Sequence, residues 1–157
     1  MSAPGHHGFT LIELAVTVAI VSILALSVLP FAETAVKRAR ESELRSALRE
    51  LRRGIDAYKK AWDEGRIEHK ADDSGYPPTL EALVAGVTDA KDARGRRIYF
   101  LRRLPRDPFA PETPPAQAWA KRSYASAPDF PSEGSDVYDV YSRAEGSGLN
   151  GVPYRQW

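Results

Sequence analysis

The chain has 157 residues, with 22 Lys and Arg against 21 Asp and Glu, and it has no cysteine. The near-zero net charge gives no whole-molecule field that would attract nucleic acid, and the lack of cysteine excludes a thiol nucleophile and a disulfide. About 126 residues follow the apolar N-terminal block, enough for one soluble domain with a modest core but not for two.

A long apolar stretch runs from Phe9 to Phe31. As an α-helix it would span roughly 34 Å, enough for a hydrocarbon core of about 30 Å. No charged residue lies within Leu14–Leu29, and the one ionisable residue of the stretch is Glu13, near its start. A carboxylate in such a place requires a partner. The sequence therefore predicts a transmembrane helix preceded by a short leader, residues 1–8.

The residues around the end of the leader form a motif, Gly8-Phe9-Thr10-Leu11-Ile12-Glu13. It resembles the processing motif of type IV pilins and of the pseudopilins of type II secretion. The resemblance implies that a membrane peptidase cuts between Gly8 and Phe9 and methylates the new amino terminus of Phe9. Glu13 would become the fifth mature residue, whose carboxylate faces the N-terminal amine of a neighbouring subunit. The alternative is an ordinary signal anchor with an incidental Glu.

The orientation in the membrane follows from this resemblance. The leader contains no Lys or Arg, whereas Lys37, Arg38 and Arg40 follow the span, so the positive-inside rule alone would place the basic side in the cytoplasm. Processing on the cytoplasmic side requires instead that the leader lies in the cytoplasm and that the basic residues after the span lie in the periplasm. We expect a single-pass inner-membrane protein with a cytoplasmic N-terminus and a periplasmic C-terminal domain, which then enters a periplasmic filament.

An amphipathic stretch follows, from Val36 to Trp62. Its apolar residues recur at spacings of three and four, as in a helix with one buried face. They are Leu44, Leu48, Leu51, Ile55, Tyr58 and Trp62. This stripe is too short for a coiled coil, so we expect it to pack on a sheet. One helix is predicted over Phe9–Asp63, with Gly65 as its stop signal and a kink between Leu26 and Pro30, since proline removes a backbone donor.

The rest of the chain predicts short elements separated by turns. Thr79 is expected to cap a short helix. The segment Leu104–Phe109 resembles the Leu-Pro-x-Asp-Pro-aromatic segment of major pseudopilins, and its two prolines should present Phe109 to the core. Strands are predicted over Trp119–Ser126 and Val137–Ser142.

An acidic loop, residues 126–139, is the candidate metal site. Calcium takes about six to eight oxygen ligands of the kinds that this loop contains. The candidate ligands are Asp129, Ser132, Asp136 and Asp139. A solvated acidic loop between two strands is the alternative. The resemblance favours calcium, because major pseudopilins commonly bind it near the C-terminus and this chain has no disulfide to serve instead.

Neither nucleic-acid binding nor catalysis is expected. The arginines between Arg94 and Arg106 have little aromatic interleaving, which is more typical of a solvated or subunit-contacting face than of a DNA site. Only His69 lies outside the leader among the histidines, and no serine occupies a nucleophile elbow. The sequence gives no reason to expect an enzyme.

Together with these features, the resemblance implies an α+β protein with the pilin fold. A long N-terminal helix, transmembrane in its first half and amphipathic in its second, would pack on a small antiparallel β-sheet with a C-terminal loop region. The predicted parts are the leader (1–8), the transmembrane and filament-core helix (9–31) and the periplasmic domain (32–157).

The resemblance implies a structural subunit of the periplasmic pseudopilus of type II secretion. The expected partners are identical and related pseudopilins in a helical filament, the prepilin peptidase, and the inner-membrane assembly platform with its ATPase. Two alternatives remain at this point. One is a major or minor type IV pilin for adhesion, motility or DNA uptake, and the other is a signal-anchored protein outside the filament class.

Overall fold

The computed structural model describes residues 10–69 and 73–157, except for the side chains of residues 26–30. Contacts within the chain divide it into two units, 1–38 and 39–157. The predicted leader and Phe9 lie outside the described residues, so the predicted boundaries after residues 8 and 31 stay predictions.

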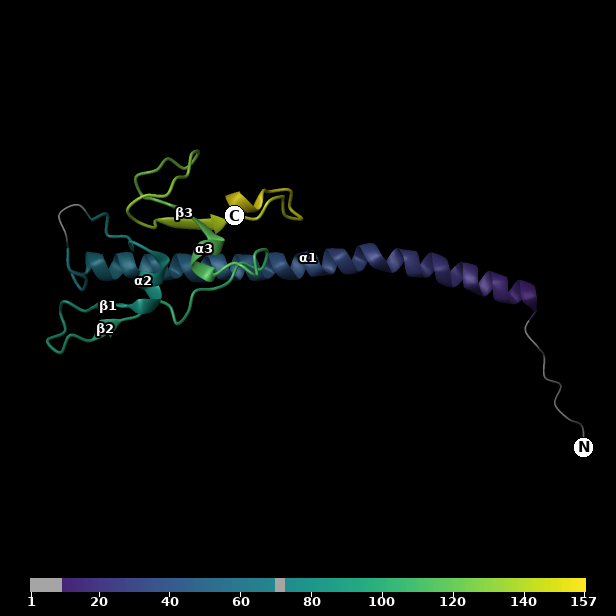
Figure 1. Ribbon diagram of the computed structural model, residues 1–157, viewed down its shortest axis with the longest axis horizontal. Coiled ribbons are helices and arrows are strands. Elements are labelled where there is room, and N and C mark those ends of the chain that lie inside the picture. The colour runs from purple at the N-terminus through teal and green to yellow at the C-terminus, as the bar shows by residue number, and fades with distance from the viewer. Residues whose placement is uncertain (1–9, 70–72) are drawn as a thin grey trace, which may run out of the picture. The chain divides into compact units, whose positions relative to one another are not determined.

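The elements follow one another along the chain as in Figure 1: α1 (Leu11–Asp63), α2 (Leu80–Ala85), β1 (Val87–Thr88), β2 (Arg97–Ile98), α3 (Pro115–Ala118), β3 (Trp119–Arg122), β4 (Asp139–Ser142) and the 3₁₀ helix η1 (Tyr154–Gln156).

Helix α1 has a side-chain cap at its first turn and a glycine at its end. Thr10 accepts the Glu13 N–H through Oγ1 at 3.3 Å, which satisfies one of the free donors of the first turn. At the other end Gly65 has a φ of 67°, and its N–H donates to the Trp62 carbonyl at 2.8 Å. The Arg66 N–H donates to the Ala61 carbonyl at 2.9 Å, which completes a Schellman motif. The prediction that Gly65 stops this helix is confirmed. The predicted kink between Leu26 and Pro30 lies outside the residues whose side chains are described.

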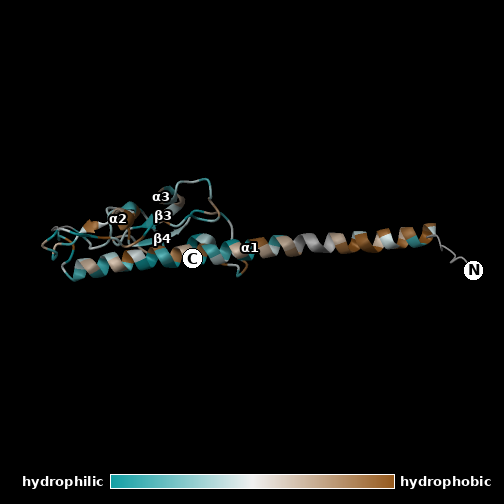
Figure 2. Ribbon diagram, turned by 90° about the horizontal axis from the view of Figure 1, so that it is seen from below, coloured by the Kyte–Doolittle hydropathy of each residue, from teal (hydrophilic) through white to brown (hydrophobic). Residues whose placement is uncertain are grey.

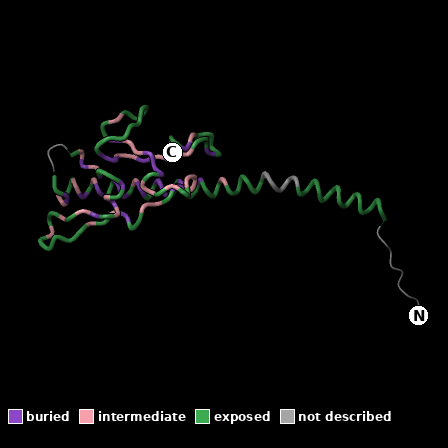
Figure 3. The backbone as a smooth tube through the Cα atoms, viewed as in Figure 1, coloured by how far each residue is buried: buried purple, intermediate pink, exposed green. Residues whose placement is uncertain are grey.

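The core of the second unit is built on the predicted apolar stripe of α1. Leu44, Leu51 and Ile55 are at most 1% exposed. Leu48 and Tyr58 are buried as well, and Trp62 packs against the same cluster. Figure 3 shows that the buried residues gather along this part of α1 and in the elements against it. The prediction that this stripe forms the packing face is confirmed.

Gly54 lies on this packing face and allows a close contact. A Cβ at this position would lie 2.9 Å from Leu101 Cγ and within 3.2 Å of both Leu101 methyl groups. The sequence alone suggests only that Gly54 weakens the helix. In the structure its missing side chain makes room for the segment that follows β2.

The short helix α2 and the sheet of β1 and β2 follow in sequence. The Thr79 side chain accepts the Ala82 N–H, as predicted for its N-cap. Gly86 ends the helix at a φ of 72°, and its N–H donates to the Ala82 carbonyl. Strands β1 and β2 are antiparallel, with Val87 opposite Ile98. Asp89, in the turn between them, forms an ion pair with Arg66, which follows α1. The side-chain hydrogen bond from Arg66 is the main cause that lowers the pKa of Asp89.

The second sheet pairs β3 with β4 in antiparallel register, Trp119 opposite Ser142 and Arg122 opposite Asp139. Both strands are shorter than predicted, because the chain leaves the ladder at Ser123, whose N–H donates to the Ser132 carbonyl. In Figure 1, β1 and β2 lie on one side of α1 and β3 on the other. In the view turned by 90°, Figure 2 shows α2, α3, β3 and β4 together on one face of α1. In the part of the chain that the structure describes, the predicted single small sheet is therefore replaced by two two-stranded sheets.

The segment Leu104–Phe109 is fixed by a buried carboxylate. Asp107 is fully buried, and its Oδ1 accepts the Phe109 N–H at 2.8 Å. Its Oδ2 accepts the Ser142 hydroxyl at 2.6 Å, which ties this segment to β4. Phe109 packs against the core, as predicted, with its ring 4.5 Å from that of Tyr154.

Candidate functional site

The first unit carries an exposed apolar helix surface. Within residues 11–24, nine large apolar side chains of α1 are 51% to 86% exposed: Leu11, Ile12, Leu14, Val16, Val18, Ile20, Val21, Ile23 and Leu24. In Figure 2 this is the most hydrophobic part of α1. A soluble domain rarely leaves such a contiguous surface uncovered. It is therefore a candidate contact surface for lipid or for other helices.

Polar side chains in this helix are satisfied by the helix itself. The Thr17 hydroxyl donates to the Leu14 carbonyl at 2.9 Å, and the Ser22 hydroxyl donates to the Val18 carbonyl at 2.7 Å. Such bonds remove the need for water around these groups. Both hydroxyls are therefore paired within the helix and need no partner outside it.

Among the residues that the structure describes, no helix combines the length and the apolar character needed to cross a membrane. The predicted span, 9–31, includes residue 9 and the side chains of 26–30, which are not among them.

Glu13 lies in the first turn of α1 and is exposed. A carboxylate there interacts favourably with the helix dipole. Gly8 and Phe9, the predicted cleavage site, lie outside the described residues. Thr10 is a functional candidate that the sequence reasoning missed. The sequence pattern that could have identified it is the Thr-x-x-Glu spacing of a capping box, Thr10 to Glu13. The Thr10 cap fixes the start of the helix two residues after the predicted cleavage site.

Two of the predicted calcium ligands have protein partners. The Asp136 carboxylate is buried and accepts the Tyr124 N–H at 2.8 Å through Oδ1. Asp139 lies on β4, with Oδ1 2.8 Å from Arg52 Nε and Oδ2 3.8 Å from Arg122 Nη2. A carboxylate between two guanidinium groups is a poor calcium ligand, because both cations would repel the ion.

The other two predicted ligands, Asp129 and Ser132, are exposed. Within 10–69 and 73–157, no group of three or more acidic or histidine side chains is placed to hold a metal ion. The donor set therefore does not fit calcium in this arrangement. Calcium binding itself stays a prediction.

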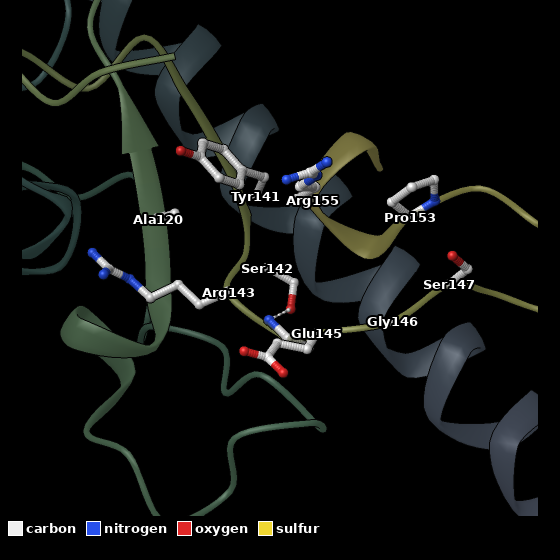
Figure 4. A pocket seen from close by; sticks show the side chains of 10 residues that line it. Ala120, Tyr141, Ser142, Arg143, Glu145, Gly146, Ser147, Pro153 and Arg155 are labelled. Carbon is white, nitrogen blue, oxygen red and sulfur yellow. Dashed lines mark hydrogen bonds between the residues drawn. The ribbon is translucent and has the colours of Figure 1, made fainter. Parts of the chain in front are cut away.

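An open hollow of about 610 Å³ lies beside β4 and the C-terminal part of the chain (Figure 4). Arg143, Glu145 and Arg155 are its charged lining residues. Arg143 pairs with Glu133 at 2.8 Å, outside the hollow. The Ser142 hydroxyl, central in the figure, accepts the N–H of Ala144 at 3.0 Å. These contacts are internal to the fold, and we assign no ligand to the hollow.

Comparison with known proteins identifies the N-terminal motif and several relatives. The profile of the prokaryotic N-terminal methylation motif matches residues 4–29. Type II secretion system core protein G of Klebsiella michiganensis is 31% identical over 113 residues, which cover 69% of this chain and 72% of that protein. The protein of that name from Aeromonas hydrophila is 33% identical over 108 residues, covering 66% and 68%. The one from Dickeya chrysanthemi is 29% identical over 156 residues, covering 93% and 95%. No solved structure matches the chain.

An N-terminal methylation motif, a long helix with an exposed apolar start and a small α+β unit define a pilin-like protein. Within that class, the chain belongs to the family of type II secretion system core protein G. The predicted resemblance to the major pseudopilin and the predicted pilin-like α+β fold are confirmed. The expected role as a structural subunit of the pseudopilus is confirmed as well, at the level of the family. A signal-anchored protein outside the filament class is no longer an alternative.

Proposed function

We propose that this chain is made as a prepilin, is cut between Gly8 and Phe9, and assembles into a periplasmic pseudopilus that supports type II secretion. The observation that carries the proposal is the exposed apolar surface of α1 directly after the methylation motif. Each large apolar side chain moved from water to an apolar environment gains about 1.5–3 kcal/mol. Lipid before assembly and neighbouring helices after it would both cover this surface.

The membrane stage belongs to the same proposal. The prepilin would wait in the inner membrane with its N-terminus in the cytoplasm, where the prepilin peptidase cuts it and methylates Phe9. The second unit would lie in the periplasm. An inner-membrane platform and its ATPase would then transfer the subunit from lipid into a filament of identical and related pseudopilins.

Glu13 would set the register of that transfer. In the mature chain it lies four residues after the new amine of Phe9, so an incoming subunit can pair its own amine with the Glu13 carboxylate of a neighbour. Both charges would lie in an apolar environment. Removing one partner of such a pair leaves the other uncompensated, at a cost of about 3–5 kcal/mol.

The test is complementation of a strain that lacks its own copy of this gene. The chain should restore secretion and yield sheared filaments, whereas Glu13→Gln should lower both at least tenfold and leave cleavage intact, since Gln keeps the size but loses the charge. Glu112→Gln, at an exposed position of the second unit, is the matched control and should behave as the parent. Filament yield at the parental level for Glu13→Gln would refute the assigned role of Glu13. If the parent is processed but does not restore secretion, the pseudopilus proposal itself fails.

A further inference from the structure

A buried carboxylate joins α1 to the C-terminal segment, residues 146–157. Glu41 is only 4% exposed and lies one turn before Leu44, on the packing face of α1. Its Oε1 accepts the Leu149 N–H at 2.8 Å and the Tyr154 hydroxyl at 3.1 Å. Burial, and next the hydrogen bond with Glu41, raises the pKa of Tyr154, so its hydroxyl keeps its proton and remains a donor at neutral pH. A buried carboxylate is tolerated when donors satisfy it in this way.

A guanidinium group makes a second connection three turns further along α1. Arg52 Nε donates to Asp139 Oδ1 at 2.8 Å. Its Nη2 donates to the Val140 carbonyl at 3.1 Å and to the Trp157 carbonyl at 2.7 Å. One side chain therefore holds both β4 and the end of the C-terminal segment against α1. The planar, permanently charged guanidinium suits this task because its donors diverge in fixed directions.

Aromatic side chains fill the space between these two connections. Tyr154 is 3% exposed, and its ring lies 5.2 Å from that of Trp157. The Arg45 guanidinium lies 4.3 Å from the centroid of the Trp157 ring, on which it forms a cation–π contact. A Cβ at Gly148 would lie 2.3 Å from Trp157 Cζ2, so the Trp157 ring can pack this closely on the segment only because residue 148 has no side chain.

These contacts restrain the C-terminal segment without an ion, and two carboxylates of the acidic loop, residues 126–139, are engaged by protein groups as well. The candidate ligand Asp139 is already used by Arg52 and Arg122, and Asp136 by the backbone of Tyr124. We infer that Glu41 and Arg52 hold the C-terminal segment on α1 by protein contacts alone, so that the folded second unit requires no divalent cation. The inference does not depend on the proposed function, because it concerns only what keeps this unit folded.

The first arm of the test uses the full chain in mild detergent and requires no variant. Thermal unfolding is followed by near-ultraviolet circular dichroism in excess EDTA and in millimolar calcium. We expect midpoints that agree within about 2 °C. An ion that held the segment at a concentration far above its dissociation constant would raise the midpoint by about 10 °C. A rise of that size overturns the inference.

The second arm measures whether Glu41 holds the segment. In Glu41→Gln the exchange of the Leu149 amide proton should accelerate at least tenfold, and the midpoint should fall by about 4–8 °C in both media. Glu43→Gln, an exposed carboxylate two residues along the same helix, is the matched control and should change neither. Unchanged exchange at Leu149 in Glu41→Gln also overturns the inference. If Glu41→Gln does not fold, Arg52→Gln gives the same comparison through the amide exchange of the C-terminal segment.

Discussion

Replacement of Trp119 by alanine is expected to destabilise the second unit by about 3–5 kcal/mol, the usual cost of removing a buried Trp or Phe. Trp119 is fully buried at the start of β3, and its indole N–H donates to the Pro105 carbonyl at 3.0 Å. The substitution opens a cavity in the core and leaves that carbonyl without its donor. Because a domain of this size has only about 5–15 kcal/mol of stability in total, much of the folded population should be lost at physiological temperature.

Denaturant titration of the full chain in detergent measures this effect. Trp119→Phe is the graded control, because it keeps most of the ring volume and loses the hydrogen bond, and it should cost about 1–2 kcal/mol. Phe130→Ala tests an exposed aromatic of the same unit and should change the stability by no more than about 0.5 kcal/mol. A loss below about 1 kcal/mol for Trp119→Ala would contradict the packing described for this core.

Removal of the Asp107 carboxylate is expected to cost about 2–4 kcal/mol. Its two oxygens accept the Phe109 N–H and the Ser142 hydroxyl inside the core. In Asp107→Ala both donors stay buried without an acceptor, and each unsatisfied group costs about 1–3 kcal/mol. The effect should exceed that of most surface substitutions because it separates the Leu104–Phe109 segment from β4.

The isosteric variant separates the hydrogen bonds from simple volume. Asp107→Asn keeps the shape but has one acceptor oxygen, so it should retain one of the two hydrogen bonds and lose about half as much stability as Asp107→Ala. Asp129→Ala, an exposed aspartate, should have a midpoint in denaturant equal to that of the parent. If Asp107→Ala is as stable as Asp129→Ala, the buried carboxylate does not fix this segment.

The features of this fold that could be predicted are those set by residues close to one another in the sequence. The three- and four-residue spacing from Leu44 to Trp62 identifies the buried face of α1, because helix geometry alone places those residues together. Gly65 and Thr79 are recognisable as helix-terminating and helix-starting residues for the same local reason.

Contacts between distant residues were not predictable in this way. Glu41 accepts a hydrogen bond from Tyr154, 113 positions away in the sequence, and Arg52 donates one to Trp157, 105 positions away. In the sequence both are ordinary charged residues of an amphipathic helix, and charged residues are usually exposed. Asp107 belongs to a motif that the sequence shows, but its buried hydrogen bond with Ser142, 35 positions away, could not be predicted. The calcium prediction used the composition of the loop and the family resemblance, neither of which could reveal that Asp139 pairs with Arg52.

If the chain is a processed prepilin, its mature N-terminal peptide has a defined mass, which can be measured. The chain is co-expressed with a prepilin peptidase, and the N-terminal peptide is analysed by tandem mass spectrometry, with Gly8→Val as the uncut control. We predict that the mature chain begins at Phe9 and carries a methyl group on its amine, and that Gly8→Val keeps the leader. A parent chain that keeps residues 1–8 in the presence of the peptidase, or that is cut after the apolar stretch, would show that it is not processed as a prepilin.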